Sequence, residues 1–111
     1  MDEAEMARTE AAFREVNETI AKTAARFEAG EADFICECAD PQCAHRITID
    51  LEQYEQVRQD PTHFMIAPGH DEPDIEHVVA REPGFRVVAK VGQTVGRIVR
   101  SLNPRTRPAE S

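Results

Sequence analysis

The chain has 111 residues, enough for one domain and little more. Its 21 acidic and 13 basic residues leave a formal net charge of −8, a field that disfavours nucleic acid and anionic lipid as partners. No apolar run approaches the roughly 20 residues that span a bilayer, and the acidic start lacks the apolar centre of a signal peptide. We therefore expect a cytoplasmic protein that does not enter a membrane.

A long amphipathic helix is the first predicted element, over residues 4–29. One apolar stripe runs along it with heptad spacing: Met6, Phe13, Val16, Ile20 and Phe27. This apolar stripe has two interpretations. It packs on the sheet of its own domain, or it forms a coiled-coil-like dimer seam that Thr9 and Thr23 weaken. Gly30 is expected to end the helix in a left-handed conformation.

The next segment holds every cysteine of the chain within eight residues: Cys36, Cys38 and Cys43. A strand over residues 34–38 would point the first two sulfurs to the same face, because side chains alternate along a strand. Asp40-Pro41 is a turn signal that can bring the third sulfur back to them. A second strand is expected over residues 46–49. The pattern predicts a zinc-knuckle-like hairpin, since three thiolates suit a tetrahedral ion and Zn²⁺ first among such ions.

A short helix is predicted over residues 51–59, because Asp50 is a good N-cap and Gln53 completes a capping box. Its expected inner contacts are Leu51, Tyr54 and Val57. A short apolar strand over residues 64–67 follows and ends at a Pro-Gly turn.

The last third of the chain predicts a β-hairpin and a short helix. The strands are expected over residues 75–80 and 85–91, with Pro83-Gly84 suited to a type II turn between them. The helix has its apolar residues spaced from Val95 to Leu102. The whole is an α+β domain over residues 1–103, with a long N-terminal helix on a small antiparallel sheet, and residues 104–111 as a disordered tail.

A fourth ligand is needed beside the three thiolates, and the chain has four histidines. His70 is favoured because the tight Pro68-Gly69 turn presents it next to a strand, and such a ligand ties distant segments together. His45, two residues after Cys43, is the alternative, whereas His63 and His77 are expected to play no part. Three thiolates and one imidazole would fill all four positions of Zn²⁺, which favours a structural site over a catalytic one.

The chain also resembles an uncharacterised family of short bacterial proteins. The family pattern runs F-x-C-E-C, then C, then E-Y-E-x-V-R, then P-G-H, and the resemblance covers about residues 10–92. This chain departs from it at Gln53, where the family tends to have an acidic residue, and at Asp50, where it tends to have Thr. The resemblance implies Cys36, Cys38, Cys43 and His70 as one set, and it implies no activity.

No phosphate-binding glycine loop, nucleophile elbow or H-E-x-x-H helix is present in the sequence. We therefore expect a non-enzymatic binding or regulatory module stabilised by zinc. Two alternatives stay open: a thiol-based redox or metal sensor that releases zinc on oxidation, and a zinc hydrolase with His45 or Asp40 near an open coordination position. The expected partner is another protein or a second copy of the chain, bound through the N-terminal helix.

Overall fold

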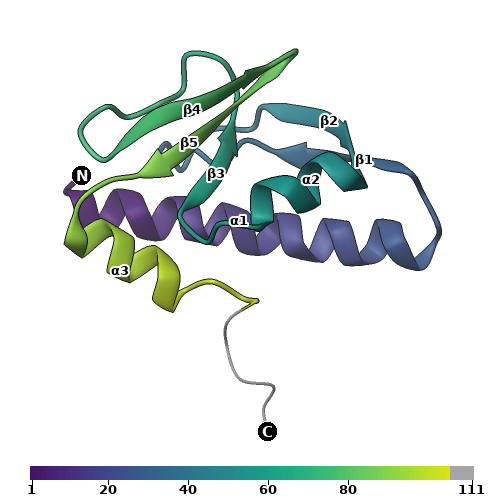
Figure 1. Ribbon diagram of the computed structural model, residues 1–111, viewed down its shortest axis with the longest axis horizontal. Helices are drawn as coiled ribbons and strands as arrows, with labels where there is room; N and C mark the ends of the chain where they lie inside the picture. Colours follow the sequence, from purple (N-terminus) through teal and green to yellow (C-terminus); the bar gives the residue numbers. More distant parts are fainter. Residues whose placement is uncertain (106–111) are drawn as a thin grey trace, which may run out of the picture.

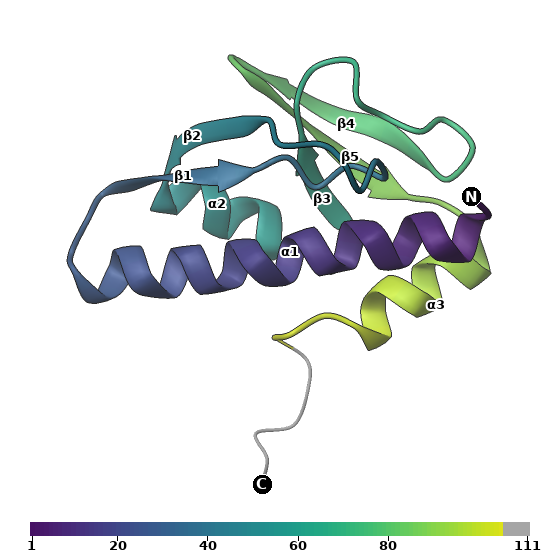
Figure 2. The same ribbon diagram turned by 180° about the vertical axis from the view of Figure 1, so that it is seen from behind.

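A helix of 24 residues, α1 (Glu3–Arg26), runs along the molecule, with two small antiparallel sheets on one side of it (Figures 1 and 2). The computed structural model describes residues 1–105. The other elements, in chain order, are β1 (Glu31–Ile35), β2 (Arg46–Asp50), α2 (Leu51–Arg58), β3 (His63–Ile66), β4 (Glu76–Glu82), β5 (Phe85–Lys90) and α3 (Gln93–Ser101). This arrangement confirms the expected α+β class with a long N-terminal helix.

The two ends of α1 are closed in different ways. At its start Asp2 and Glu5 form a capping box, each side chain accepting a hydrogen bond from the backbone N–H of the other. At its end Glu28 takes the left-handed conformation, with φ of 57°, and the amide of Ala29 donates to the carbonyl of Ala24. The prediction that Gly30 would take this role was wrong, because the chain already reverses two residues earlier.

The face of α1 that packs against the domain is offset from the apolar stripe. The buried residues of the helix are small or polar: Ala7, Glu10, Ala11, Arg14, Asn17, Glu18 and Ala21. Within the apolar stripe, Met6 and Ile20 touch the edge of the core, but Val16 is 46% exposed and Phe27 is 75% exposed. The stripe therefore lies on the flank and outer side of the helix, and charged side chains fill much of the space that apolar ones were expected to fill.

Strand pairing divides the β-structure into two sheets where the sequence predicted one. β1 pairs only with β2, and β5 lies between β3 and β4. The segment after β1 connects the sheets, because the amide of Cys36 donates to the carbonyl of His45 whereas the amide of Glu37 donates to that of Met65 in β3. The predicted strand over residues 34–38 ends at Ile35 for this reason, and the cysteines follow the strand.

Local signals in the sequence are confirmed at several turns and caps. Asp50 and Gln53 form the predicted capping box of α2, with Gln53 N–H donating to Asp50 over 2.7 Å. Gly84 has φ of 85° in the tight turn between β4 and β5, as a type II turn after proline requires. Tyr54 and Val57 are buried inner contacts of α2, and Leu51 is half-buried.

The predicted tail, residues 104–111, lies mostly outside the described residues. Its second residue, Arg105, docks on the domain, since its guanidinium donates to the carboxylates of Glu18 and Glu55 over 2.7 to 3.2 Å. These ion pairs hold the end of the described chain against α1, through Glu18, and against α2, through Glu55.

Candidate metal centre

Four ligand atoms from three segments meet at one point above α1. Cys36 and Cys38 follow β1, Cys43 lies in the loop that returns to β2, and His70 follows β3. Their three Sγ atoms and one imidazole nitrogen all lie within 4.8 Å of one another. The structure thus brings together the four residues that the sequence favoured, and their donor atoms can hold a metal ion.

The spacing of the donor atoms matches the edges of a small tetrahedron. His70 Nδ1 lies 3.5 Å from Cys36 Sγ and 3.7 Å from Cys43 Sγ. A tetrahedral ion with metal–sulfur bonds of about 2.3 Å and metal–nitrogen bonds of about 2.0 Å sets such sulfur–nitrogen edges at roughly 3.5 Å. An ion of this kind therefore fits between the ligands with shifts of only fractions of an ångström on that side of the site.

Backbone amides act on all three sulfurs. Ala67 N–H donates to Cys36 over 3.2 Å. The amides of Asp40 and His45, each two residues further along the chain, act to lower the pKa of Cys38 and of Cys43. These donors favour thiolates over thiols, and they orient the sulfurs toward the common centre.

The Cys36 and Cys38 thiols interact, and this interaction separates their acidities. The neighbouring Cys36 lowers the pKa of Cys38 to about 5. The interaction with Cys38 and burial together raise the pKa of Cys36 well above its ordinary value. A lowered thiol pKa favours the thiolate, which is the form that binds a metal.

The remaining histidines lie outside the set of four. His45 is exposed and its ring meets the His70 ring edge-on, with 5.7 Å between ring centroids. His63 faces the Asp60 carboxylate over 3.4 Å, and His77 lies exposed on β4. The predicted preference for His70 over His45 agrees with this geometry, since His45 contacts a ligand without joining the sulfurs.

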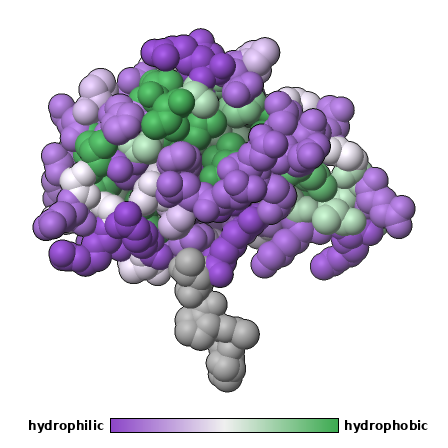
Figure 3. Space-filling view, viewed as in Figure 1, coloured by the Kyte–Doolittle hydropathy of each residue, from purple (hydrophilic) through white to green (hydrophobic). Residues whose placement is uncertain are grey.

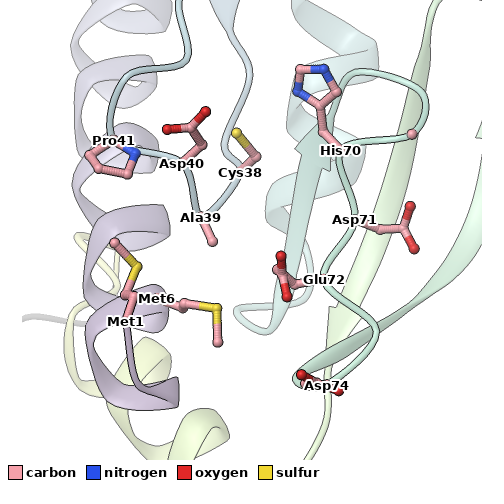
Figure 4. A pocket seen from close by; sticks show the side chains of 11 residues that line it. Met1, Met6, Cys38, Ala39, Asp40, Pro41, His70, Asp71, Glu72 and Asp74 are labelled. Atoms are coloured by element: carbon pink, nitrogen blue, oxygen red, sulfur yellow. The ribbon is translucent and has the colours of Figure 1, made fainter.

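A hollow of about 590 Å³ opens beside the centre, with Cys38 and His70 on opposite walls (Figure 4). Met1 and Met6 lie at its α1 side. Four acidic residues also line the hollow: Asp40, Asp71, Glu72 and Asp74. A negative field at the open side of the centre raises the local concentration of cations.

Comparisons with known proteins find no significant similarity to this chain. No family model, no curated protein and no solved structure matches it significantly. The resemblance to a family of short bacterial proteins therefore stays a prediction, and the account of the site depends on its own geometry. Within residues 1–105, no helix has both the length and the apolar character that crossing a bilayer requires.

Glu37, between the first two cysteines, is the functional residue that sequence reasoning missed. Its side chain is fully buried. The carboxylate accepts hydrogen bonds from Asn17 of α1 over 2.7 Å and from the Met65 amide of β3 over 3.0 Å, and it pairs with Arg58 of α2 over 3.4 Å. Glu37 therefore fixes the cysteine loop to three elements at once, and only its position between two ligands could have indicated this.

Further buried charges lie around the Phe64 ring in the core. Arg14 and Lys90 place their cationic groups 4.4 and 4.8 Å from the ring centroid. The buried Lys90 ammonium also contacts the buried carboxyl groups of Glu10 and Glu76. Burial raises the pKa of Glu10 to about 8, which keeps this carboxyl neutral near pH 7.

Proposed function

We propose that the protein is a non-enzymatic binding or regulatory domain whose fold is stabilised by one Zn²⁺ on Cys36, Cys38, Cys43 and His70. The observation that carries the proposal is the meeting of their four donor atoms within 4.8 Å. Three thiolates and one imidazole are a ligand set that Zn²⁺ favours, and hard cations such as Mg²⁺ and Ca²⁺ prefer oxygen.

A structural role follows from the number of ligands. Four protein ligands fill the coordination sphere of tetrahedral zinc, so no position is left for the water or substrate that catalysis needs. The ion would join the loop between β1 and β2 to the turn after β3, segments that lie 27 or more residues apart along the chain. Such a link stabilises a domain of modest size because the unfolded chain loses the preformed site.

The partners we propose are proteins, in a reducing compartment such as the cytoplasm. A net charge of −8 opposes nucleic acid and anionic membranes. Reduced thiolates persist where the thiol pool is reducing, which is the setting in which clustered cysteines hold metal.

Elemental analysis of the purified protein tests the proposal. We expect about one zinc per chain in wild-type protein, and less than about a tenth of this in a Cys36→Ser, Cys43→Ser double variant, because two thiolate ligands are lost. His45→Ala is the matched control and should keep its zinc. A wild-type protein that stays metal-free after supply of zinc, or that carries iron instead, contradicts the proposal.

A thiol-based sensor is the second candidate, and the exposure of one side of the site favours it. Cys36 and Cys38 are buried, but Cys43 is half-buried and His70 is exposed. Hydrogen peroxide can therefore reach Cys43. Two thiolates would pass two electrons to the peroxide, which takes two protons from solvent to become two waters, and the disulfide that forms would release Zn²⁺. A chromogenic zinc indicator measures the release. Zinc that stays bound at peroxide doses which oxidise exposed thiols removes this candidate.

A further inference from the structure

Val16 and Phe27 of the apolar stripe lie on the face of α1 that points away from the core, whereas Met6 and Ile20 pack against the edge of the core. Val16 and Ala7 are nine residues apart, which places them about 180° apart around a helix of about 3.6 residues per turn. Ala7 is fully buried and Val16 is 46% exposed, in agreement with this angle. Phe27, eleven residues after Val16, returns to within about 20° of the same line and is 75% exposed. Large apolar side chains thus lie on the face of α1 that the domain leaves open.

No other described element covers this face. α3 lies along one flank of α1, the sheets lie on the other side, and no helix or strand crosses in front of α1 in Figure 2. Beside Val16, the small residues Ala12 and Thr19 and the end of α3 at Leu102 line a hollow of about 470 Å³. The open face therefore has both exposed apolar side chains and a shallow space beside them.

We propose that a second copy of this chain docks on this face through its own α1, as an antiparallel helix pair. Heptad spacing is the pattern of helices that pack side by side. Each seven-residue repeat has two apolar positions, named a and d, that face the partner helix. In an antiparallel pair, position a of one helix packs against position d of the other. A two-fold axis between Phe13 and Val16 places Phe13 of each copy against Val16 of the other. The same register places Met6 against Thr23 and Ile20 against Thr9, so the contact is most apolar at its centre.

The charges at the rim of this pair are complementary to themselves. In this register Glu5, near the start of α1, lies beside Arg26, near the end of α1 of the second copy. Both side chains are exposed, and the two-fold axis repeats the ion pair at each end. A parallel arrangement would instead bring like charges together at each end. Charge complementarity therefore selects the antiparallel orientation and a second copy as the occupant.

The oligomeric state of the zinc-loaded protein tests this proposal, measured by light scattering after size exclusion. We expect twice the mass of one chain for the wild type, and one chain mass for Val16→Glu, with the dimer dissociation constant raised at least about tenfold by the buried charge. Val79→Glu is the matched control, because Val79 on β4 is 45% exposed and Figure 3 shows further apolar residues over β4 and β5, and this variant should stay dimeric. Circular dichroism checks that the variants keep their helices, and Phe13→Glu is a second variant at the centre of the proposed pair.

A charge exchange tests the register. Arg26→Glu should raise the dissociation constant a few-fold, and adding Glu5→Arg should bring it back toward the wild-type value, because the ion pair is restored in the opposite sense. A wild-type monomer at concentrations near 100 μM, or folded Val16→Glu and Phe13→Glu variants that stay dimeric, overturns the proposal. A double variant weaker than Arg26→Glu alone overturns the antiparallel register.

Discussion

The metal centre and the inner face of α1 hold distant segments together by opposite means. In the metal centre, four donor atoms lie close together near the surface, where they can bind an external cation. The inner face buries Glu10, Arg14 and Asn17 and satisfies most of them from within the chain. The first region therefore depends on the metal supply and on the redox state of the thiols, whereas the second depends on pH and on complete partnering of buried charges.

Glu37 is the residue at which the two regions meet. It lies between two metal ligands, yet its carboxylate belongs to the polar interior with Asn17 and Arg58. A cation that fixes the cysteine loop also fixes this carboxylate in place. The metal centre and the polar interior are thus coupled through one side chain, and disrupting it should affect both.

The largest effect is expected for Glu37→Ala. Its removal leaves the Arg58 guanidinium buried beside unpaired donors, and breaking a buried ion pair from one side costs about 3–5 kcal/mol. Chemical denaturation with zinc in excess measures the free energy of unfolding. Glu31→Ala, at an exposed position on β1, is the control and should change it by less than about 0.5 kcal/mol. Equal effects of the two substitutions would show that the buried carboxylate does not stabilise the fold.

His70→Ala should have the next largest effect, and this variant tests the metal centre alone. We expect a loss of zinc affinity of at least about 100-fold, because a ligand is removed, and a loss below about tenfold for His45→Ala, which removes only a ring beside the ligand. Competition with a chromogenic chelator measures both affinities. The reverse order would assign the fourth position to His45.

Glu10, on the inner face of α1, should make the free energy of unfolding depend on pH. Burial raises the pKa of Glu10 from its ordinary value of 4.5 to about 8 in the folded protein, so between these values the folded state holds a proton that the unfolded state has lost. The stabilisation is complete below pH 4.5 and declines as pH rises to about 8, with a slope of at most about 1.4 kcal/mol per pH unit.

Glu10→Gln should remove this part of the slope. The informative quantity is the difference in unfolding free energy between wild type and variant from pH 5.5 to 8.5, with zinc in excess, because effects on the thiolates are common to both proteins. A difference that does not change with pH would mean that Glu10 is ionised in the folded state.

Arg105→Ala should have the smallest effect. Its ion pairs with Glu18 and Glu55 are partly exposed to water, where such pairs contribute less than about 1 kcal/mol. Thermal unfolding compared with wild type gives the measurement. A loss as large as that for Glu37→Ala would place the end of the described chain among the main determinants of stability.

Prediction from the sequence succeeded where the deciding interactions are local or chemically distinctive. Asp50 with Gln53 predicts the start of a helix, and Pro83-Gly84 predicts a turn. Both predictions rest on interactions between residues that lie within four positions of each other. Three cysteines in a short window have few uses other than metal binding or redox chemistry, and a turn-borne histidine completed the set.

The polar interior was missed because its residues look like surface residues in the sequence. Glu10 and Arg14 stand four apart, which is the spacing of an exposed ion pair on a helix. Their burial is decided by Phe64 and Lys90, which lie more than 45 residues away in the chain. The division into two sheets has the same origin, since the Glu37 amide pairs with Met65 and not with β2.

X-ray absorption at the zinc edge of the purified protein tests the central claim most directly. The account predicts a first shell of three sulfurs at about 2.3 Å and one nitrogen at about 2.0 Å, with the nitrogen scattering replaced or lost in His70→Ala. A shell made only of oxygen and nitrogen, or one unchanged by His70→Ala, would contradict a centre built from these four residues.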